Sequence, residues 1–258
     1  MRRKKKRKLK KQFKIILITV PILAALVALI IFAFQLKTVK VSSDLKQFTE
    51  GEVKTYMDKE KIDNTLLFWL RNKIGKSNQI DLFEEYSVKM NSPFKITITA
   101  YEKKLKGYIQ SDKVYYYFDG DGKILKISSE KIKSVPEVTG LEYNKLEQYK
   151  KIYANNQEAL DTLLKYANAI EEYDFGVKQI DVSPKKEITL YIKNIQVQLG
   201  TDSNMDKKLL ALNDIYDNVV KYSGVLNMKR VSADGSYTLK KIKKSTKKDS
   251  KSKAKDKK

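Results

Sequence analysis

The sequence has no cysteine and no histidine among its 258 residues. Without cysteine, a thiol nucleophile, a thiolate metal site and a disulfide are excluded. Without histidine, a Ser-His-Asp triad and histidine-ligated zinc are excluded as well. Serine and lysine are abundant, but no S-x-x-K stands at a helix start with the motifs that a penicilloyl-serine enzyme needs. We therefore expect a protein that is not an enzyme and has no cofactor or metal.

Acidic residues are scarce at the two ends of the chain, where the positive charge is concentrated. The sequence has 53 Lys and Arg against 31 Asp and Glu, a net charge of +22. Residues 1–14 hold ten basic residues and no acidic one, and residues 240–258 hold eleven lysines against two aspartates. The part between them is nearly balanced, so a basic nucleic-acid face is not indicated and we expect no nucleic-acid partner.

Charge is absent altogether from residues 15–36, which form a mostly apolar run of 22 residues. As a helix this run would be about 33 Å long, close to the thickness of a bilayer core. A cleaved signal peptide would have a shorter apolar region and a small-x-small cleavage site, and the run ends in Ala33-Phe34-Gln35-Leu36 instead. We predict a single transmembrane helix, with the basic residues 1–14 holding the N-terminus in the cytoplasm and the C-terminus outside the cell.

The segment after the span predicts a small domain of mixed α and β structure. A strand is expected at 38–42, a helix begins with Thr49 as N-cap, and a second helix ends at Gly75. Alternating residues from Tyr86 to Ala100, interrupted by Asn91-Ser92-Pro93, predict two further strands. The expected order over residues 37–105 is β-α-α-β-β.

The following segment, 106–240, favours strands with a few helices. A hairpin is expected around the turn at 119–122, and a second one around Lys193-Asn194. Helices are expected at 149–172 and 207–222, further strands at 180–182, 225–228 and 236–239, and disorder at 241–258. The predicted fold class is α+β, with a mostly antiparallel second domain.

Two motifs in the first hairpin have a functional and a structural interpretation. Asp119, Asp121 and Glu130 occupy three positions of a calcium loop, but Ile124 stands where that loop needs glycine, so a hairpin turn is favoured. The run Tyr115–Tyr117 could stack on sugars, but alternating tyrosines are also ordinary core residues of a half-buried strand.

The arrangement of tail, span and two domains resembles the FtsQ/DivIB family of cell-division proteins. The segments that carry the resemblance are Val39-Lys40-Val41, 94–102, the hairpin 115–125, 135–141, 188–200 and 224–228. The resemblance implies a POTRA domain at 37–105 and a β domain at 106–240. It also implies a non-enzymatic membrane scaffold at the division septum, with FtsL-like and DivIC/FtsB-like partners and septal peptidoglycan synthases as further partners.

In this family the partner adds a strand to the far edge of the β domain, where unpaired N–H and C=O groups are available. The resemblance places that edge in the last strands, and the partner-binding candidates are Val225, Met228, Tyr237 and Leu239. Two alternatives remain open from the residues: a POTRA-type secretion accessory, and a membrane-anchored cell-wall binding protein that uses the aromatic hairpin.

Overall fold

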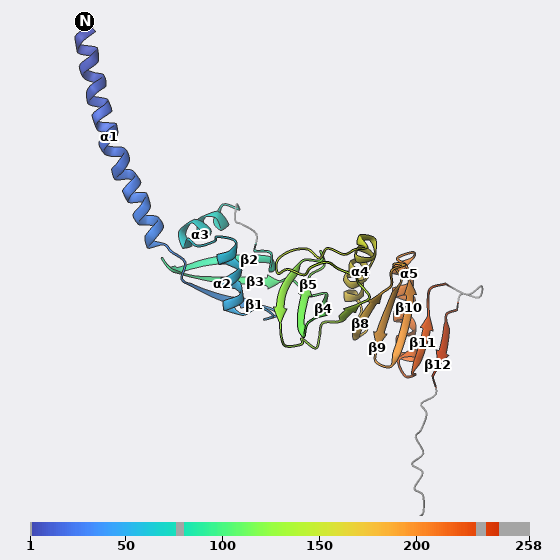
Figure 1. Ribbon diagram of the computed structural model, residues 1–258. Coiled ribbons are helices and arrows are strands. Elements are labelled where there is room, and N and C mark those ends of the chain that lie inside the picture. Colours follow the sequence, from blue (N-terminus) through green and yellow to red (C-terminus); the bar gives the residue numbers. More distant parts are fainter. Residues whose placement is uncertain (1, 76–79, 231–235, 243–258) are drawn as a thin grey trace, which may run out of the picture. The chain divides into compact units, whose positions relative to one another are not determined.

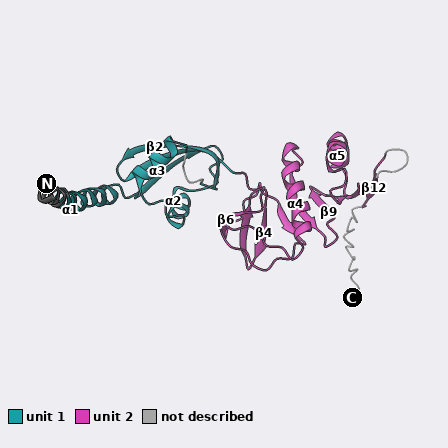
Figure 2. Cartoon of the chain, turned by 90° about the horizontal axis from the view of Figure 1, so that it is seen from above, with its two compact units in different colours: residues 1–103 teal, residues 104–258 magenta. Residues whose placement is uncertain are grey.

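A computed structural model of the chain describes residues 2–75, 80–230 and 236–242. The chain divides into two compact units, Met1–Lys103 and Lys104–Lys258 (Figure 2). Both mix helices with strands, which confirms the predicted α+β class.

The elements of each unit are labelled in Figure 1. The first unit contains α1 (Arg2–Ala33), β1 (Thr38–Ser43), α2 (Glu50–Lys59), α3 (Thr65–Lys73), β2 (Phe83–Ser92) and β3 (Lys95–Glu102). The second contains β4 (Gly107–Ser111), β5 (Val114–Phe118), β6 (Ile124–Ser128), β7 (Glu137–Thr139), α4 (Gln157–Ala169), the short 3₁₀ helix η1 (Ile170–Glu172), β8 (Val177–Val182), β9 (Ile188–Ile192), β10 (Ile195–Gly200), α5 (Met205–Val219), β11 (Gly224–Asn227) and β12 (Thr238–Lys241).

Helix α1 contains most of the apolar run, residues 15–33. Its segment Phe13–Ala33 has 21 residues, a mean hydropathy of 3.1 and no burial within the protein, so it is long and apolar enough to cross a membrane. The helix ends at Ala33 rather than at Leu36, because the next residues bond to another part of the unit. Gln35 forms a bridge with Asn64, and the Leu36 N–H donates to the carbonyl of Asp63 at 2.7 Å.

The body of the first unit has the predicted β-α-α-β-β order. Its three strands form a sheet in the order β1-β3-β2, in which β1 is parallel to β3 and β2 is antiparallel to it. Helix α2 begins with a complete capping box: Glu52 N–H donates to the Thr49 hydroxyl, and Glu52 Oε2 accepts from Thr49 N–H. Helix α3 has Asn64 as its N-cap, whose side-chain oxygen accepts from Leu67 N–H.

A buried carboxylate joins β3 to the chain that follows β1. Glu102 is 2% exposed, and its two oxygens accept from the Ser43 hydroxyl and from Gln47 N–H, each at 2.6 Å. The Glu102 N–H in turn donates to Asp44 Oδ1 at 3.0 Å. These bonds satisfy a charged group that would otherwise be costly to bury.

The second unit contains a nine-stranded sheet in the order β12-β11-β10-β9-β8-β7-β4-β5-β6. Five of its pairings are antiparallel and three are parallel, which agrees with the predicted mostly antiparallel sheet. Along β8, β9 and β10 buried apolar residues alternate with half-buried ones, so one face of this part of the sheet is the core face.

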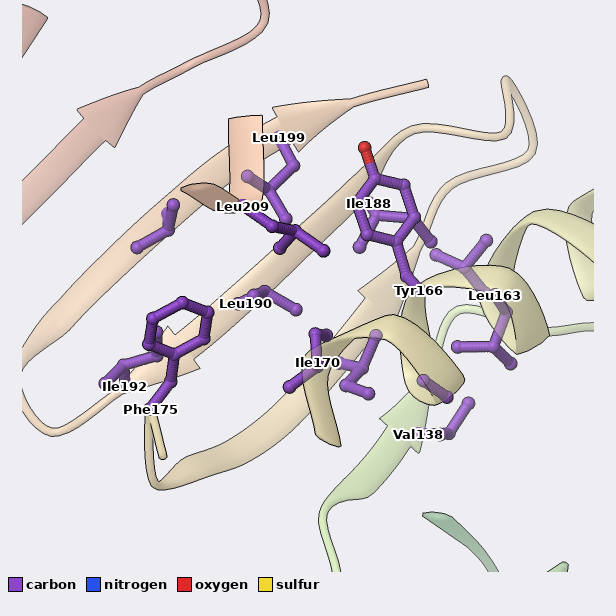
Figure 3. Packing of buried hydrophobic residues seen from close by; sticks show 14 of the residues in the cluster. Val138, Leu163, Tyr166, Ile170, Phe175, Ile188, Leu190, Ile192, Leu199 and Leu209 are labelled. Carbon is purple, nitrogen blue, oxygen red and sulfur yellow. The ribbon is translucent and has the colours of Figure 1, made fainter. Parts of the chain in front are cut away.

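Helices α4 and α5 supply the other side of this core. Figure 3 shows Leu163, Tyr166 and Ile170 of the α4 region packed against the sheet side chains Leu190 and Ile188. All of these side chains are buried, and Tyr166 also donates its hydroxyl to the Thr201 carbonyl at 2.9 Å. Burial raises the pKa of Tyr166 above its usual range.

The second unit differs from the sequence expectation in three respects. The last strand, expected at 236–239, is Thr238–Lys241, so Lys241 belongs to the sheet and not to the disordered tail expected at 241–258; residues 243–258 of that tail lie outside the described residues. The helix expected from Tyr149 begins at Gln157, because Tyr149 has a left-handed backbone (φ 67°) and its N–H donates to the carbonyl of Ile124, the first residue of β6. Asn156 then caps the helix through its side-chain oxygen. Strands β4 and β7 were not predicted. Strand β4 forms a hairpin with the adjacent β5, whereas β7 has only three residues and pairs with β4 and β8, which are distant in the sequence.

Candidate partner-binding edge

The candidate site is the end of the second unit's sheet, which is formed by β11 and β12. Strand β11 runs parallel to β10 after a crossover through α5, and β12 pairs antiparallel with β11. In the part of the chain that the structure describes, no strand pairs with the outer side of β12. Among the described residues, the outer side of β12 is therefore an open sheet edge.

A buried lysine fixes the crossover helix that leads to this edge. Lys208 in α5 is 6% exposed, and its amine donates to the carbonyls of Leu199 at 2.7 Å and Thr201 at 3.1 Å. Burial lowers the pKa of the Lys208 amine below its usual value. The two bonds hold the start of α5 on the end of β10 and so set where β11 enters the sheet.

Glycine allows β12 to approach β11 closely. A Cβ atom placed on Gly224 would overlap with the carbonyl oxygen of Lys240 and would lie 3.1 Å from Lys241 Cα. The backbone of Lys240 belongs to the sheet ladder and has little freedom to withdraw. The close pairing of the two strands therefore requires glycine at position 224.

The register of β12 determines which backbone groups face outward. Ile242 N–H donates to the Ser223 carbonyl at 2.8 Å, just beyond the pairing of Gly224 with Lys241. Backbone groups of an antiparallel strand alternate between its two sides. The N–H and C=O groups of Leu239 and Lys241 therefore point away from β11, to the side where an added strand would bond.

The four predicted partner-binding residues lie on these strands or directly beside them, but in different settings. Leu226 pairs with Leu239, so Leu239 shares the core face, and it is half-buried at the margin of the core together with Tyr237. Val225 is half-buried on the opposite face. Met228 is fully buried in the core, so its side chain presents no surface to a partner.

The edge is basic. Lys240 and Lys241 are both exposed, and Lys241 Nζ lies 3.5 Å from the ring centroid of Tyr222. This geometry is a cation–π contact that holds the lysine beside the strand end. An added segment with acidic residues would therefore meet a complementary charge.

The opposite end of the sheet, at β6, is partly covered by its own chain. Ile124 at the start of β6 accepts a bond from Tyr149 N–H at 2.7 Å and donates to the Lys150 carbonyl at 2.9 Å. Lys123 forms a further bridge with Lys151. Edge strands of native proteins are commonly covered in this way, which leaves β12 as the more accessible edge.

The two motifs of the first hairpin take structural roles. Asp119 Oδ1 accepts from the N–H groups of Asp121 and Lys123, which builds the turn, and the described residues contain no acidic cluster suited to a metal. Tyr117 is fully buried, and its hydroxyl donates to the Glu130 carbonyl and accepts from Ile132 N–H. The ring and hydroxyl of Tyr117 therefore belong to the core, and this burial raises the pKa of the hydroxyl.

These features define a class of protein: a two-unit α+β body that follows an N-terminal apolar helix, with an open sheet edge at one end of the second unit. Residues 107–234 match the family model described as "Cell division protein FtsQ/DivIB, C-terminal". The chain is also similar to the cell division protein DivIB of Clostridium tetani (strain Massachusetts / E88), with 27% identity over 128 residues. That match covers 47% of this chain and 47% of the relative, so it spans about half of each. The chain belongs to the FtsQ/DivIB family of cell-division proteins.

Proposed function

We propose that this protein is a non-enzymatic scaffold of the division septum, anchored in the cell membrane by α1. Family membership supports the division role, and the apolar segment Phe13–Ala33 supports the anchor. The basic residues 1–14 favour a cytoplasmic N-terminus, with residues 37–105 as a POTRA domain and 106–240 as a β domain outside the cell.

The open edge of β12 is the observation that carries the proposal. A partner segment would add a strand there, accepting and donating bonds to the outward groups of Leu239 and Lys241. FtsL-like and DivIC/FtsB-like division proteins are the proposed partners, and septal peptidoglycan synthases are expected to join through them. Tyr237, Leu239 and Val225 would contact the side chains of the added strand, while Met228 supports the strand from within the core.

The test separates backbone pairing from side-chain contact at a single position. Lys241→Pro removes an N–H group that points away from β11, whereas Lys241→Ala removes the side chain and keeps that group. We expect the proline variant to lose recovery of FtsL and DivIC from crosslinked membranes. The alanine variant should retain most of it. Equal recovery with both variants would contradict strand addition at this edge.

A second variant tests the side-chain contribution. Tyr237→Lys places a charge at the margin of the core beside the added strand, and we expect it to weaken partner recovery while membrane insertion is unchanged. A division role would itself be contradicted if mass spectrometry of the full-length protein recovered secretion components or wall fragments in place of division proteins.

A further inference from the structure

The body of the first unit is hydrogen-bonded to the end of the membrane-spanning helix at several points. Thr65 N–H, at the start of α3, donates to the Phe34 carbonyl at 2.8 Å, and the Asn64 side chain donates to the Ile31 carbonyl at 3.1 Å. Lys37 N–H donates to the Phe94 carbonyl at 2.9 Å in the β2–β3 turn. Two elements, the start of α3 and this turn, therefore lie directly beside the point where the apolar helix ends.

Helix α3 carries an exposed apolar face. Leu67, Leu70 and Ile74 are 46%, 45% and 63% exposed. Their spacing of three and four residues places them on one side of the helix. Phe68, on another side, is buried and stacks on Tyr86 of β2, so the helix has one apolar face in the core and a second that the described residues leave partly exposed.

The exposed apolar residues of the first unit's body lie mostly at the end that adjoins the membrane-spanning helix α1. Between residues 34 and 103 the large apolar residues described as exposed are Leu67, Leu70, Ile74, Phe94, Leu45 and Tyr101. The first four belong to α3 and its end or to the β2–β3 turn, the two elements that bond to the end of α1. Leu45 follows the end of β1 and Tyr101 is the last residue but one of β3, and these parallel strands run away from the span.

Side chains typical of a membrane interface accompany this face. Trp69, the only tryptophan of the chain, is half-buried next to Leu70, and Lys73 Nζ lies 5.0 Å from its ring centroid. Arg71 and Lys61 line a cavity of about 150 Å³ at the start of α3, together with Asp63. Tryptophan and basic residues beside an apolar surface are the composition with which proteins contact lipid headgroups.

We propose that α3 and Phe94 rest on the membrane surface at the end of α1, with Leu67, Leu70 and Ile74 in the headgroup region of that leaflet. The hydrogen bonds to Phe34 and Ile31 keep α3 at the level where the apolar helix leaves the bilayer. A nine-residue helix is about 14 Å long, which sets the extent of membrane surface that α3 would contact. Arg71 and Lys61 then face lipid phosphates. The contact depends on α1 as the anchor and is independent of the partner at β12.

The single tryptophan makes this proposal directly measurable. The full-length protein is reconstituted in vesicles of phosphatidylcholine and phosphatidylglycerol, with bromine atoms placed either near the glycerol end or near the middle of the acyl chains. Quenching of Trp69 emission should be strong with the shallow bromines and weaker with the deep ones. An aqueous quencher should have a small effect.

Matched variants separate lipid contact from general apolar exposure. Leu70→Glu places a negative charge on the face and should abolish most of the bromine quenching, and Ile74→Glu, beyond the last helical residue, should do the same without altering the helix interior. Leu45→Glu changes a leucine of similar exposure, 42% against 45%, at the other end of the unit, and should leave the quenching unchanged.

Two results would overturn the proposal. Trp69 emission that is insensitive to both bromine positions and open to the aqueous quencher would place α3 in water. Protection of Trp69 from both kinds of quencher would mean that protein covers the face, either a second copy of the chain or a different partner.

Discussion

The backbone of Gly224 lies so close to the carbonyl oxygen of Lys240 that no β-carbon fits between them. This contact joins β11 to β12, and β12 is the strand that forms the edge of the sheet. The absence of a side chain at position 224 therefore determines how closely β12 pairs with β11, and so the geometry of the proposed partner site.

Gly224→Ala tests that link. The added methyl group should force β12 away from β11, so the amides of 238–241 should exchange hydrogen faster and partner recovery should fall. Gly51→Ala is the control, because its Cβ would meet nothing closer than Thr49 Oγ1 at 4.0 Å. That change in α2 should stabilise the first unit by about 0.5–1 kcal/mol. Unchanged exchange in Gly224→Ala would show that the strands tolerate a wider separation.

Buried tyrosine predicts loss of stability in alkali. Burial raises the pKa of Tyr56 to about 12, above its ordinary value of 10.0. A group whose folded pKa is raised contributes stability that is complete below the unfolded pKa and is lost as pH rises through the folded one. Unfolding of the first unit, followed by Trp69 emission in detergent, should therefore require about 2–3 kcal/mol less at pH near 12 than at pH near 9 because of this residue.

The matched variants for this prediction are Tyr56→Phe and Tyr101→Phe. The first removes the buried hydroxyl, which accepts from Asp81 N–H at 3.2 Å, and should flatten the alkaline loss of stability. The second removes a solvent-exposed hydroxyl and should leave that loss as it is. If both variants lose stability as steeply as the original chain, Tyr56 is not its source.

The buried Lys208 predicts that its contribution to stability increases with pH, in contrast to the loss expected from Tyr56. Its lowered folded pKa means that the unfolded chain binds the proton more readily, so its contribution to stability rises as pH increases from the lowered value toward 10.5. Lys208→Met should remove this rise and take away the lysine donor of the Leu199 carbonyl, whereas the Thr201 carbonyl keeps its bond from the Tyr166 hydroxyl. We expect a loss of about 1–3 kcal/mol at neutral pH, measured by circular dichroism.

The contrast between two glutamates tests the buried bonds at the end of β3. Glu102→Gln replaces one acceptor oxygen by a donor amide that must face either the Ser43 hydroxyl or the Gln47 N–H. We expect the first unit to lose about 1–3 kcal/mol of stability, read again from Trp69 emission. Glu84→Gln alters an exposed residue of the neighbouring strand and should be nearly neutral. Similar effects of the two changes would show that the bonds to Glu102 contribute little.

Most elements were predictable because their signals are local. The capping box of Thr49 and Glu52 marks the start of α2, and apolar alternation marks β9 and β10 on either side of Lys193-Asn194. The parallel pairing of β10 with β11 was not predictable from periodicity, because it joins segments separated by a helix. The same is true of β7, whose three residues carry too few side chains for a pattern.

The site was predicted only in part. The last strands do form a sheet edge, but the burial of Met228 depends on a register that places it with Leu226 on the core face. The sequence also did not show which face of α3 is exposed. Leu66, Leu67, Trp69 and Leu70 are apolar on nearly every side of the helix, so spacing alone does not distinguish the buried face from the exposed one.

The position of β12 in the chain has a consequence for shortened forms of the protein. Among the described elements it is the last to be synthesised, after α5 and β11 that hold it in place. A chain shortened before β12 would end its sheet at β11 and lack the outward groups of Leu239 and Lys241. The proposed partner site would then be lost although α5 and β11 remain, so a truncation of a few residues could abolish partner binding without unfolding the second unit.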